Sequence, residues 1–354
     1  MKSGRSLANL AQEFERQLAT KRDLIVPSAL MHFETDDSGD AHITIDEKQC
    51  DGMYGVTNLA RRQLAEKLKI PFQYFERMRV EQPRLLDHNV NTWLQADGDR
   101  RMVRTLDGAI RAILSDRYRR LDNYDLAENV LPILHRLPDA RFESVELTET
   151  RMYLKVVTPK IEYEIAPGDI VQAGIVICNS EVGEGTLSVQ PLIYRLVCRN
   201  GLIASDRALR KSHLGRVWQS GEAAIDVFRD DTLAADDKAF FLKARDVVQA
   251  AVSQATFVQV AQKLQKTLAI KVTGDPVKAV EVLANRQDLN EAERYGVLRR
   301  LIVEGDLSAY GMVNAVTNYS QEVADYDRAT GLEALGGTLI DLSIEQWKEV
   351  VDAA

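Results

Sequence analysis

Cysteine is scarce in this sequence, and long hydrophobic runs are absent. The 354 residues include three cysteines, and an odd, sparse set is typical of free thiols in a reducing compartment. The N-terminal segment MKSGRSLANLAQEFERQL lacks the hydrophobic core of a secretory signal. No stretch approaches the ~18 apolar residues of a membrane-spanning helix. These absences predict a cytoplasmic protein that does not contact membranes.

Familiar catalytic and metal-binding motifs are also absent. The glycine-rich stretch CNSEVGEG does not end in the Lys-Ser/Thr pair of a phosphate-binding loop, which argues against a nucleoside triphosphatase. Cys178, Cys198 and His213 do not show the paired C-x-x-C spacing of a zinc site. The sequence therefore predicts no metal and no cofactor, and a non-enzymatic protein is favoured.

The distribution of turns and apolar residues predicts an α+β fold. With 45% hydrophobic and 28% charged residues, the chain has an ordinary globular composition and room for two structural units. Asp107-Gly108 is a strong hairpin signal, and EVGEG joins two longer strands that should pair antiparallel. After about residue 220, apolar residues recur with helical spacing. We predict an antiparallel-rich sheet core with flanking helices over residues 1–220, then a helical C-terminal region over residues 221–354.

Positive charge is concentrated in one stretch of an otherwise acidic chain. Residues 100–120 hold seven arginines and two aspartates, whereas the whole chain carries a net charge of −8. Guanidinium groups bind phosphate bidentately, and an aromatic ring among them can stack on a base. This combination suits single-stranded nucleic acid. The predicted phosphate contacts are Arg104, Arg111, Arg117, Arg120 and Arg195, with Tyr118 as the stacking residue.

A second basic cluster follows the strand-rich region, and it adds Arg207, Arg210 and Lys211 to the predicted nucleic-acid contacts. Together the two stretches could line one positively charged groove across a sheet. Two alternatives remain open. The second cluster could be an exposed basic loop, and the first arginines could form salt bridges with aspartates, the candidates being Asp107, Asp116, Asp122 and Asp125.

Strand alternation also orients one of these arginines. Residues two apart share a face of a strand, so residues 110–115 should divide into two faces: Arg111, Ile113 and Ser115 on one, and Ile110, Ala112 and Leu114 on the other. The second face belongs in a core. Arg111 would then lie near a ligand-binding face of the sheet or pair with a carboxylate.

A set of polar residues supports a competing hypothesis, an enzyme. At a strand end, a Gly-rich turn can expose backbone N–H groups to an anion; the alternative for CNSEVGEG is a hairpin loop with polar capping. A hydrolytic or nucleotide-processing pocket would be built around Asp116, Glu181 and His213. The wider set of candidate residues is Asp116, Asn123, Asn179, Ser180, Glu181, Asn200 and His213. A third hypothesis is a non-enzymatic factor that binds other proteins through an exposed apolar patch of the helical region.

The segment RRQLAEKLKIPFQYFERMR (61–79) allows two interpretations. Two short helices separated by Ile70-Pro71 would suit a helix-turn-helix motif for duplex DNA. The apolar residues better fit the core of a helical hairpin, formed by Leu64, Leu68, Phe72 and Phe75. We therefore favour the hairpin.

Four stretches of the chain resemble a known family. LKIPFQYFERM, RTLDGAIRAILSDRYRRLDN, GIVICNSEVGEGTLSV and YRLVCRNGL, in this order, resemble the phage- and plasmid-borne family called domain of unknown function 932, over residues 50–340. The resemblance implies a protein of mobile genetic elements and no established reaction. A strand-rich core with a trailing helical region is also similar in outline to phage single-strand annealing recombinases.

The leading prediction is thus a nucleic-acid-binding protein of phages or plasmids. It would hold single-stranded DNA, or promote its annealing in recombination, with a homo-oligomer as the expected assembly. If phosphate contacts dominate, a plot of log affinity against log salt concentration should have a slope of about −0.7 per neutralised phosphate.

Overall fold

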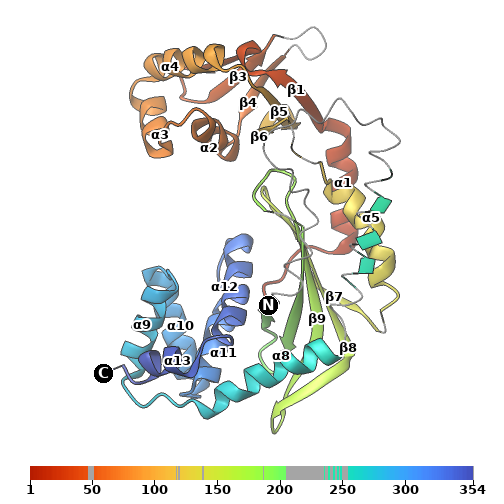
Figure 1. Cartoon of the computed structure of the whole chain (residues 1–354), viewed down its shortest axis with the longest axis vertical. Helices are drawn as coiled ribbons and strands as arrows, with labels where there is room; N and C mark the ends of the chain where they lie inside the picture. The colour runs from red at the N-terminus through yellow and green to blue at the C-terminus, as the bar shows by residue number, and fades with distance from the viewer. Residues whose placement is uncertain are drawn as a thin grey trace.

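The computed structural model describes residues 1–46, 52–116, 118, 120–137, 139–185, 187–204 and 254–353, with residues 235, 238–239, 242–243, 245–246 and 248 in between. Two mostly antiparallel sheets and a helical C-terminal region make up the fold, so the predicted α+β class is confirmed. Figure 1 shows the N-terminal sheet with its helices at the top, the second sheet below it, and the C-terminal helices beside the lower part of that second sheet. The predicted boundary at residue 220 falls outside the described residues.

The first sheet has the strand order β1-β5-β6-β4-β3-β2. Its strands are β1 (Arg22–Pro27), β2 (Met31–Thr35), β3 (Ala41–Ile45), β4 (Gly52–Val56), β5 (Arg100–Leu106) and β6 (Ala109–Ser115). Neighbours pair antiparallel except β4 and β6, which are parallel. One face is covered by three helices: α2 (Asn58–Lys67), α3 (Phe72–Glu81) and α4 (Pro83–Ala96). Leu64 and Phe75 are buried there, and Leu68 and Phe72 pack against the same core, as the helical-hairpin interpretation predicts.

The second sheet has the order β11-β10-β9-β8-β7, and all its neighbours pair antiparallel. Its strands are β7 (Arg141–Leu147), β8 (Met152–Ala166), β9 (Asp169–Asn179), β10 (Ser188–Arg195) and β11 (Gly201–Ile203). Helices α1 (Leu7–Thr20) and α5 (Asn123–Leu134) pack on one face, and the rings of Phe14 and Tyr124 meet edge to face. The predicted antiparallel pairing of β9 with β10 is confirmed.

The C-terminal region contributes six described helices. They are α8 (Gln254–Lys266), α9 (Pro276–Arg286), α10 (Glu291–Glu304), α11 (Ala309–Tyr319), α12 (Tyr326–Leu339) and α13 (Ile344–Val351). They share one apolar core with Val171, Ala173 and Ile193 of the second sheet. Two short 3-10 turns, η1 (Ser28–Leu30) and η2 (Thr267–Ala269), are also present. Within the described ranges, no helix is both long and apolar enough to cross a bilayer.

Local signals in the sequence fix several element ends. Thr57 caps α2 by accepting the N–H of Ala60, and Asn290 with Glu293 forms a capping box at the start of α10. The Asp107-Gly108 turn has φ values of +53° and +78°, as expected for the hairpin between β5 and β6. These features depend on neighbouring residues alone, and the structure contains them where the sequence predicts them.

The predicted division of β6 into two faces is correct for Ala112 and Leu114, which share a buried face, but wrong for Ile110, because a β-bulge interrupts the strand. The register of β5 against β6 shifts, and Arg111 is the extra residue of the bulge. Ile110 and Ile113 consequently enter the core beneath the helices, whereas Ala112 and Leu114 pack on the opposite face. The bulge therefore turns Arg111 toward the second sheet.

Candidate functional site at the junction of the two sheets

The two sheets meet just after β9, where residues 180–185 form what we call the junction loop. Gln63 of α2 holds this loop: its amide nitrogen donates to Val182 O at 2.7 Å, and its amide oxygen accepts a backbone N–H of β6 at 2.9 Å. Gly183 has φ +83°, and a Cβ atom there would lie 2.7 Å from Leu114 Cδ2. The loop thus fits closely against β6, and the fit requires glycine.

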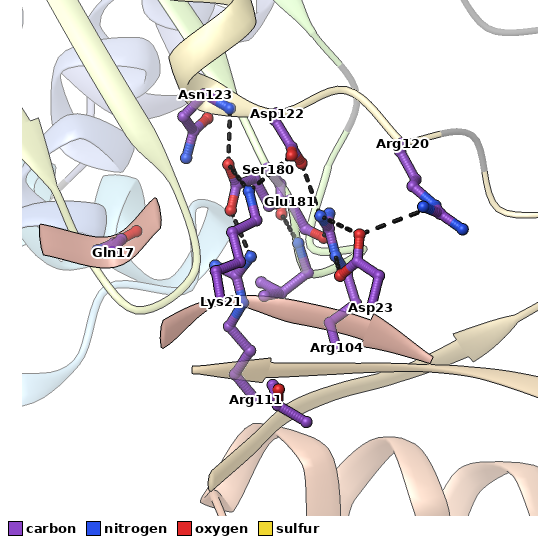
Figure 2. A network of polar contacts seen from close by, with 12 residues as sticks. Gln17, Lys21, Asp23, Arg104, Arg111, Arg120, Asp122, Asn123, Ser180 and Glu181 are labelled. Atoms are coloured by element: carbon purple, nitrogen blue, oxygen red, sulfur yellow. Dashed lines mark hydrogen bonds and ion pairs between the residues drawn. The ribbon is translucent and has the colours of Figure 1, made fainter. Parts of the chain in front are cut away.

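Glu181 of the junction loop collects donors from three separate segments, as Figure 2 shows. Its carboxylate accepts from Arg111 Nη2 at 2.6 Å, from Lys21 Nζ at 3.1 Å and from the backbone N–H of Asn123 at 2.6 Å. Only 4% of Glu181 is exposed. Lys21 follows α1, Arg111 lies on β6 and Asn123 begins α5. One carboxylate therefore ties the second sheet to the first sheet and to both of these helices.

Arg104 of β5 forms the second centre of the site. Its guanidinium group donates two hydrogen bonds to Asp23, at 2.8 and 2.9 Å, one to Asp122 at 2.6 Å, and one to the backbone carbonyl of Glu181 at 2.8 Å. Lys21 Nζ also lies 2.8 Å from Asp122. The Arg104 side chain has no exposed surface. A buried charge is tolerated when it is paired and hydrogen-bonded in this way.

Together these residues form what we call the Glu181 cluster: Lys21, Asp23, Arg104, Arg111, Arg120, Asp122 and Glu181. It brings four cations together with three carboxylates. Arg120 is the outermost cation, because its guanidinium lies 3.8 Å from Asp23 Oδ2 and its side chain is 51% exposed (Figure 2). The excess positive charge of the cluster is therefore at its solvent edge.

The charges of the cluster set the protonation of its members. Burial alone would raise the pKa of Asp122, but the charges of Arg104 and Lys21 outweigh burial and hold the pKa below its ordinary value. Burial acts to lower the pKa of Arg104, whereas its hydrogen bonds to Asp23 and the charges around it raise that pKa overall. Asp122 and Arg104 are therefore both ionised at neutral pH.

The junction loop uses its backbone N–H groups internally. Ser180 Oγ accepts the N–H groups of Val182 at 3.3 Å and Glu184 at 3.0 Å, and it donates to Thr150 O at 2.8 Å. The carbonyl of Glu184 in turn accepts hydrogen bonds from Arg151. This pattern matches the polar-capping alternative for the loop and leaves these N–H groups unavailable to an anion.

Four residues predicted for a polar pocket do converge: Asn123, Asn179, Ser180 and Glu181 are all buried at the junction. Asn179 Nδ2 donates to Asn123 Oδ1 at 2.8 Å and to Leu121 O at 3.0 Å. Their polar atoms thus fix the turn that leads into α5.

Of the other three predicted pocket residues, two lie elsewhere in the described part of the chain. Asp116 follows β6, where its carboxylate accepts from Ser115 at 3.3 Å. Asn200 precedes β11 and donates to Thr317 Oγ1 of α11 at 2.6 Å, so it belongs to the contact with the C-terminal helices. His213 lies outside the described residues. The structure therefore does not bring Asn200 to Glu181.

The predicted nucleic-acid contacts divide between internal and external positions. Arg104 and Arg111 are held inside the Glu181 cluster, and Tyr118 donates its hydroxyl to Ser180 O at 3.0 Å. Burial raises the pKa of Tyr118. Arg195 forms two 2.8 Å hydrogen bonds to Asp169. Because Arg104 has no exposed surface, a phosphate group could not reach it in this conformation.

Salt bridges with aspartate were the alternative for these arginines, and Arg104 with Asp122 is such a pair. Asp107 instead pairs with Arg16 of α1, at 2.7 Å. Among the remaining predicted contacts, Arg120 is half exposed. The others lie outside the described residues: Arg117, Arg207, Arg210 and Lys211.

Sequence reasoning missed the N-terminal contribution to this site. Lys21 lies 160 positions from Glu181, and Asp23 lies 81 positions from Arg104. The available signal was the run Lys21-Arg22-Asp23, which places three charges between a helix and a strand. It also missed two exposed arginines, Arg22 and Arg100, although Arg100 belongs to the arginine-rich stretch.

The fold and the site define a class of protein: an α+β chain whose two sheets are joined by a buried ion-pair cluster. Its described residues include no group of three or more His, Cys, Asp or Glu side chains suited to a metal ion. The family model described as Domain of unknown function (DUF932) matches residues 112–335, and the chain belongs to this family, as its motifs predict. No curated protein and no solved structure matches the chain. The matched range includes Asp122 and Glu181 but begins after Lys21, Asp23, Arg104 and Arg111.

Proposed function

We propose that this chain binds nucleic acid, with single-stranded DNA as the preferred form, through arginines exposed along β1. These are Arg22 of β1, Arg100 of β5, which contacts Ile25 O of β1, and Arg120, which lies beside Asp23 of β1. We call them the β1 arginine row. All three are exposed, and β1 is an edge strand of the first sheet. The proposal moves the expected interface from the buried arginines of the Glu181 cluster to its solvent edge.

One observation supports the proposal most strongly: no guanidinium group of the row forms a hydrogen bond with a carboxylate of a described residue. Arg22 Nη1 donates to Lys21 O at 2.7 Å, and Arg100 Nη2 donates to Ile25 O at 3.2 Å. Within the described part of the chain, Arg120 contacts one carboxylate, that of Asp23, at 3.8 Å. Each group therefore keeps a free donor edge and most of its charge, as bidentate phosphate binding requires.

The geometry favours a single strand over a duplex. The backbone positions contacted by Arg22 and Arg100 lie about four residues apart, or ~13 Å along β1 at ~3.3 Å per residue. A flexible strand can follow such an edge, whereas reading duplex DNA usually requires an element that enters the major groove. Annealing, a homo-oligomeric assembly and a role in phage or plasmid recombination belong to the same proposal.

The competing hypothesis of a hydrolytic or nucleotide-processing pocket has less support. Asn123, Asn179 and Ser180 are buried and hydrogen-bonded to one another or to the backbone. A pocket that acts on a substrate would need some of these polar atoms to face it. These polar atoms instead form hydrogen bonds that hold the segments of the junction together.

A salt-titrated binding assay tests the proposal with single-stranded DNA, duplex DNA and single-stranded RNA. The test variant is Arg22→Gln/Arg100→Gln/Arg120→Gln. The control, Arg77→Gln/Lys263→Gln/Lys278→Gln, removes the same charge from exposed positions that pair with carboxylates. We expect the test variant alone to lose affinity for single-stranded DNA and to reduce the log–log salt slope by about 2, at about 0.7 per lost phosphate contact. Equal affinities of the two variants, or a wild-type chain that binds none of the probes, would overturn the proposal.

A further inference from the structure

A cavity of about 270 Å³ lies between the second sheet and α12. Gln190 of β10 and Ile203 of β11 line it from the sheet, and Leu332 and Leu335 line it from the helix. Cavities for drug-sized ligands measure about 300–1,000 Å³. This cavity therefore suits a molecule of about nucleoside size or smaller.

Gly331 is a glycine of α12 that packing does not explain. A Cβ atom on Gly336 would lie 2.3 Å from Thr317 Cγ2, and one on Gly337 would lie 2.0 Å from Ile203 O. Those two glycines let α12 approach its neighbours. A Cβ atom on Gly331 would meet no atom within 4 Å, although glycine is less favourable than alanine inside a helix. At Gly331, the missing side chain provides open space, and that space is part of the cavity.

The polar groups of the cavity indicate its chemistry. Gln190 and Gln287 line it, and neither side-chain amide forms a hydrogen bond with a described residue. Thr338 also lines it, and its hydroxyl donates to Ala334 O at 3.4 Å. A primary amide offers a donor beside an acceptor, the pattern with which glutamine pairs to a nucleobase edge. Arg328 contributes little net charge, because its Nε and Nη2 atoms bind Glu293 at 2.6 and 2.7 Å. Two glutamine amides together with two leucines suit a flat, uncharged heterocycle with adjacent donor and acceptor atoms.

We propose that this cavity binds a single nucleobase, either in a free nucleoside or extruded from a nucleic-acid strand. Leu332 and Leu335, three residues apart on α12, would contact one face of the ring, and the amides of Gln190 and Gln287 would pair with its edge. The proposal goes beyond nucleic-acid binding by the β1 arginine row, since the cavity uses none of those residues. Either proposal can fail without the other.

Isothermal titration calorimetry on the full chain tests the cavity with adenosine, guanosine, cytidine, uridine and thymidine. Gly331→Phe should cover the mouth of the cavity, and Gly331→Ala is the matched control because a Cβ atom fits there. We expect at least one nucleoside to bind one-to-one with a Kd below roughly 1 mM. Gly331→Phe should weaken binding at least tenfold, whereas Gly331→Ala should leave it unchanged.

A second variant and two further arms complete the test. Gln190→Leu is close in size and removes one amide, so it should also weaken binding tenfold and would decide the question if Gly331→Phe failed to fold. Nucleoside binding should survive in Arg22→Gln/Arg100→Gln/Arg120→Gln. If a short single-stranded oligonucleotide displaces the nucleoside, the natural ligand of the cavity is a base extruded from a strand. If it does not, the natural ligand is a free nucleoside. The proposal is overturned if no nucleoside binds, or if Gln190→Leu and folded Gly331→Phe bind as the wild type does.

Discussion

Two buried ion-pair sites join different parts of this molecule, and they are built differently. The Glu181 cluster joins the two sheets with several cations and carboxylates. The second site, which we call the α12 pair, joins the second sheet to α12 with one cation and one carboxylate. Lys155 Nζ of β8 lies 2.7 Å from Glu333 of α12, and neither side chain is exposed. Thr330 accepts a further hydrogen bond from Lys155 at 2.9 Å, and the ring of Tyr326 lies 4.6 Å from the same ammonium group.

The difference teaches what each site contributes. Guanidinium groups bind carboxylates in a fixed planar geometry, so the Glu181 cluster defines how one sheet faces the other. An ammonium group is a point charge with little directional preference. In the α12 pair, each buried charge therefore neutralises the other. The pair does less than the Glu181 cluster to fix how the elements that it joins are oriented. We expect apolar side chains to replace the pair more readily than they replace the cluster.

The largest expected effect is the loss of Glu181. Glu181→Gln leaves Lys21 and Arg111 buried without their shared counter-charge, and we expect the free energy of unfolding to fall by about 3–5 kcal/mol. Chemical denaturation followed by circular dichroism measures this. Glu184→Gln is the control in the same loop: it breaks a pair with the half-exposed Arg62 and should cost about 0–1 kcal/mol. Similar losses in the two variants would contradict a special role for Glu181.

The next largest effect is expected when both partners of an ion pair are replaced, because the α12 pair and the Glu181 cluster should respond differently. Glu333→Leu alone should cost about 3 kcal/mol, and adding Lys155→Met should recover most of that loss, because the buried charge is then removed with its partner. The corresponding double variant Arg111→Met/Glu181→Leu should recover less, because Lys21 keeps Asp122 but loses Glu181, and the buried N–H of Asn123 loses its acceptor. Double-mutant cycles from denaturation curves measure both effects. Equal recovery at both sites would remove the distinction between them.

A smaller effect should follow from altering the fit of the junction loop. Gly183→Ala introduces a side chain at φ +83° and places it 2.7 Å from Leu114 Cδ2, so we expect a loss of about 1–3 kcal/mol. Gly305→Ala is the control, because Gly305 has φ +72° but nothing within 4 Å of the added atom. The difference between the two melting temperatures isolates the steric contact. If the two losses are equal, the contact with β6 does not matter.

The smallest expected effect is the acid dependence of the cluster. The pKa of Asp122 is held below its ordinary value in the folded chain, so the unfolded chain binds more protons at acidic pH. The ionised Asp122 carboxylate therefore contributes fully to stability above about pH 4, the ordinary aspartate pKa. This contribution is lost as pH falls through the pKa that Asp122 has in the folded chain. Asp122→Asn should flatten the fall of stability with decreasing pH in denaturation curves below pH 4.

Asp125 gives the matching control for that measurement. Burial and the charge of Asp122 raise the pKa of Asp125, so its protonation favours the folded state as pH falls. Asp125→Asn should therefore make the loss of stability on acidification steeper. If Asp122→Asn and Asp125→Asn shifted the pH dependence in the same direction, the proposed balance of charges would be incorrect.

The sequence predicted those parts of the fold that a few adjacent residues determine. Thr57, Asn290 and the Asp107-Gly108 turn act on their immediate neighbours, and they lie where the pattern indicated. The bulge at Arg111 was not predictable, because it depends on the register of β5 against β6. A change of one residue in register exchanges the faces of a strand.

The candidate site was predicted in two halves that the sequence could not join. Arg104 and Arg111 were assigned to phosphate, with a carboxylate partner as the alternative, and Glu181 was assigned to a separate polar pocket. The structure pairs these halves with each other. Charge counted along a chain contains no information on which distant carboxylate will lie beside an arginine. Arg195 was also assigned to phosphate, whereas the structure pairs it with Asp169 within the second sheet.

The N-terminal position of Lys21 has a consequence for synthesis of the chain. Glu181 follows Lys21 by 160 residues, and ribosomes add roughly 5–20 residues per second, so roughly 8–32 s separate the two. During that interval the nascent chain exposes the apolar side of α1 and carries Lys21 without its final counter-ion. The contact that joins α1 to the junction loop can therefore form only after Glu181 has been added to the chain.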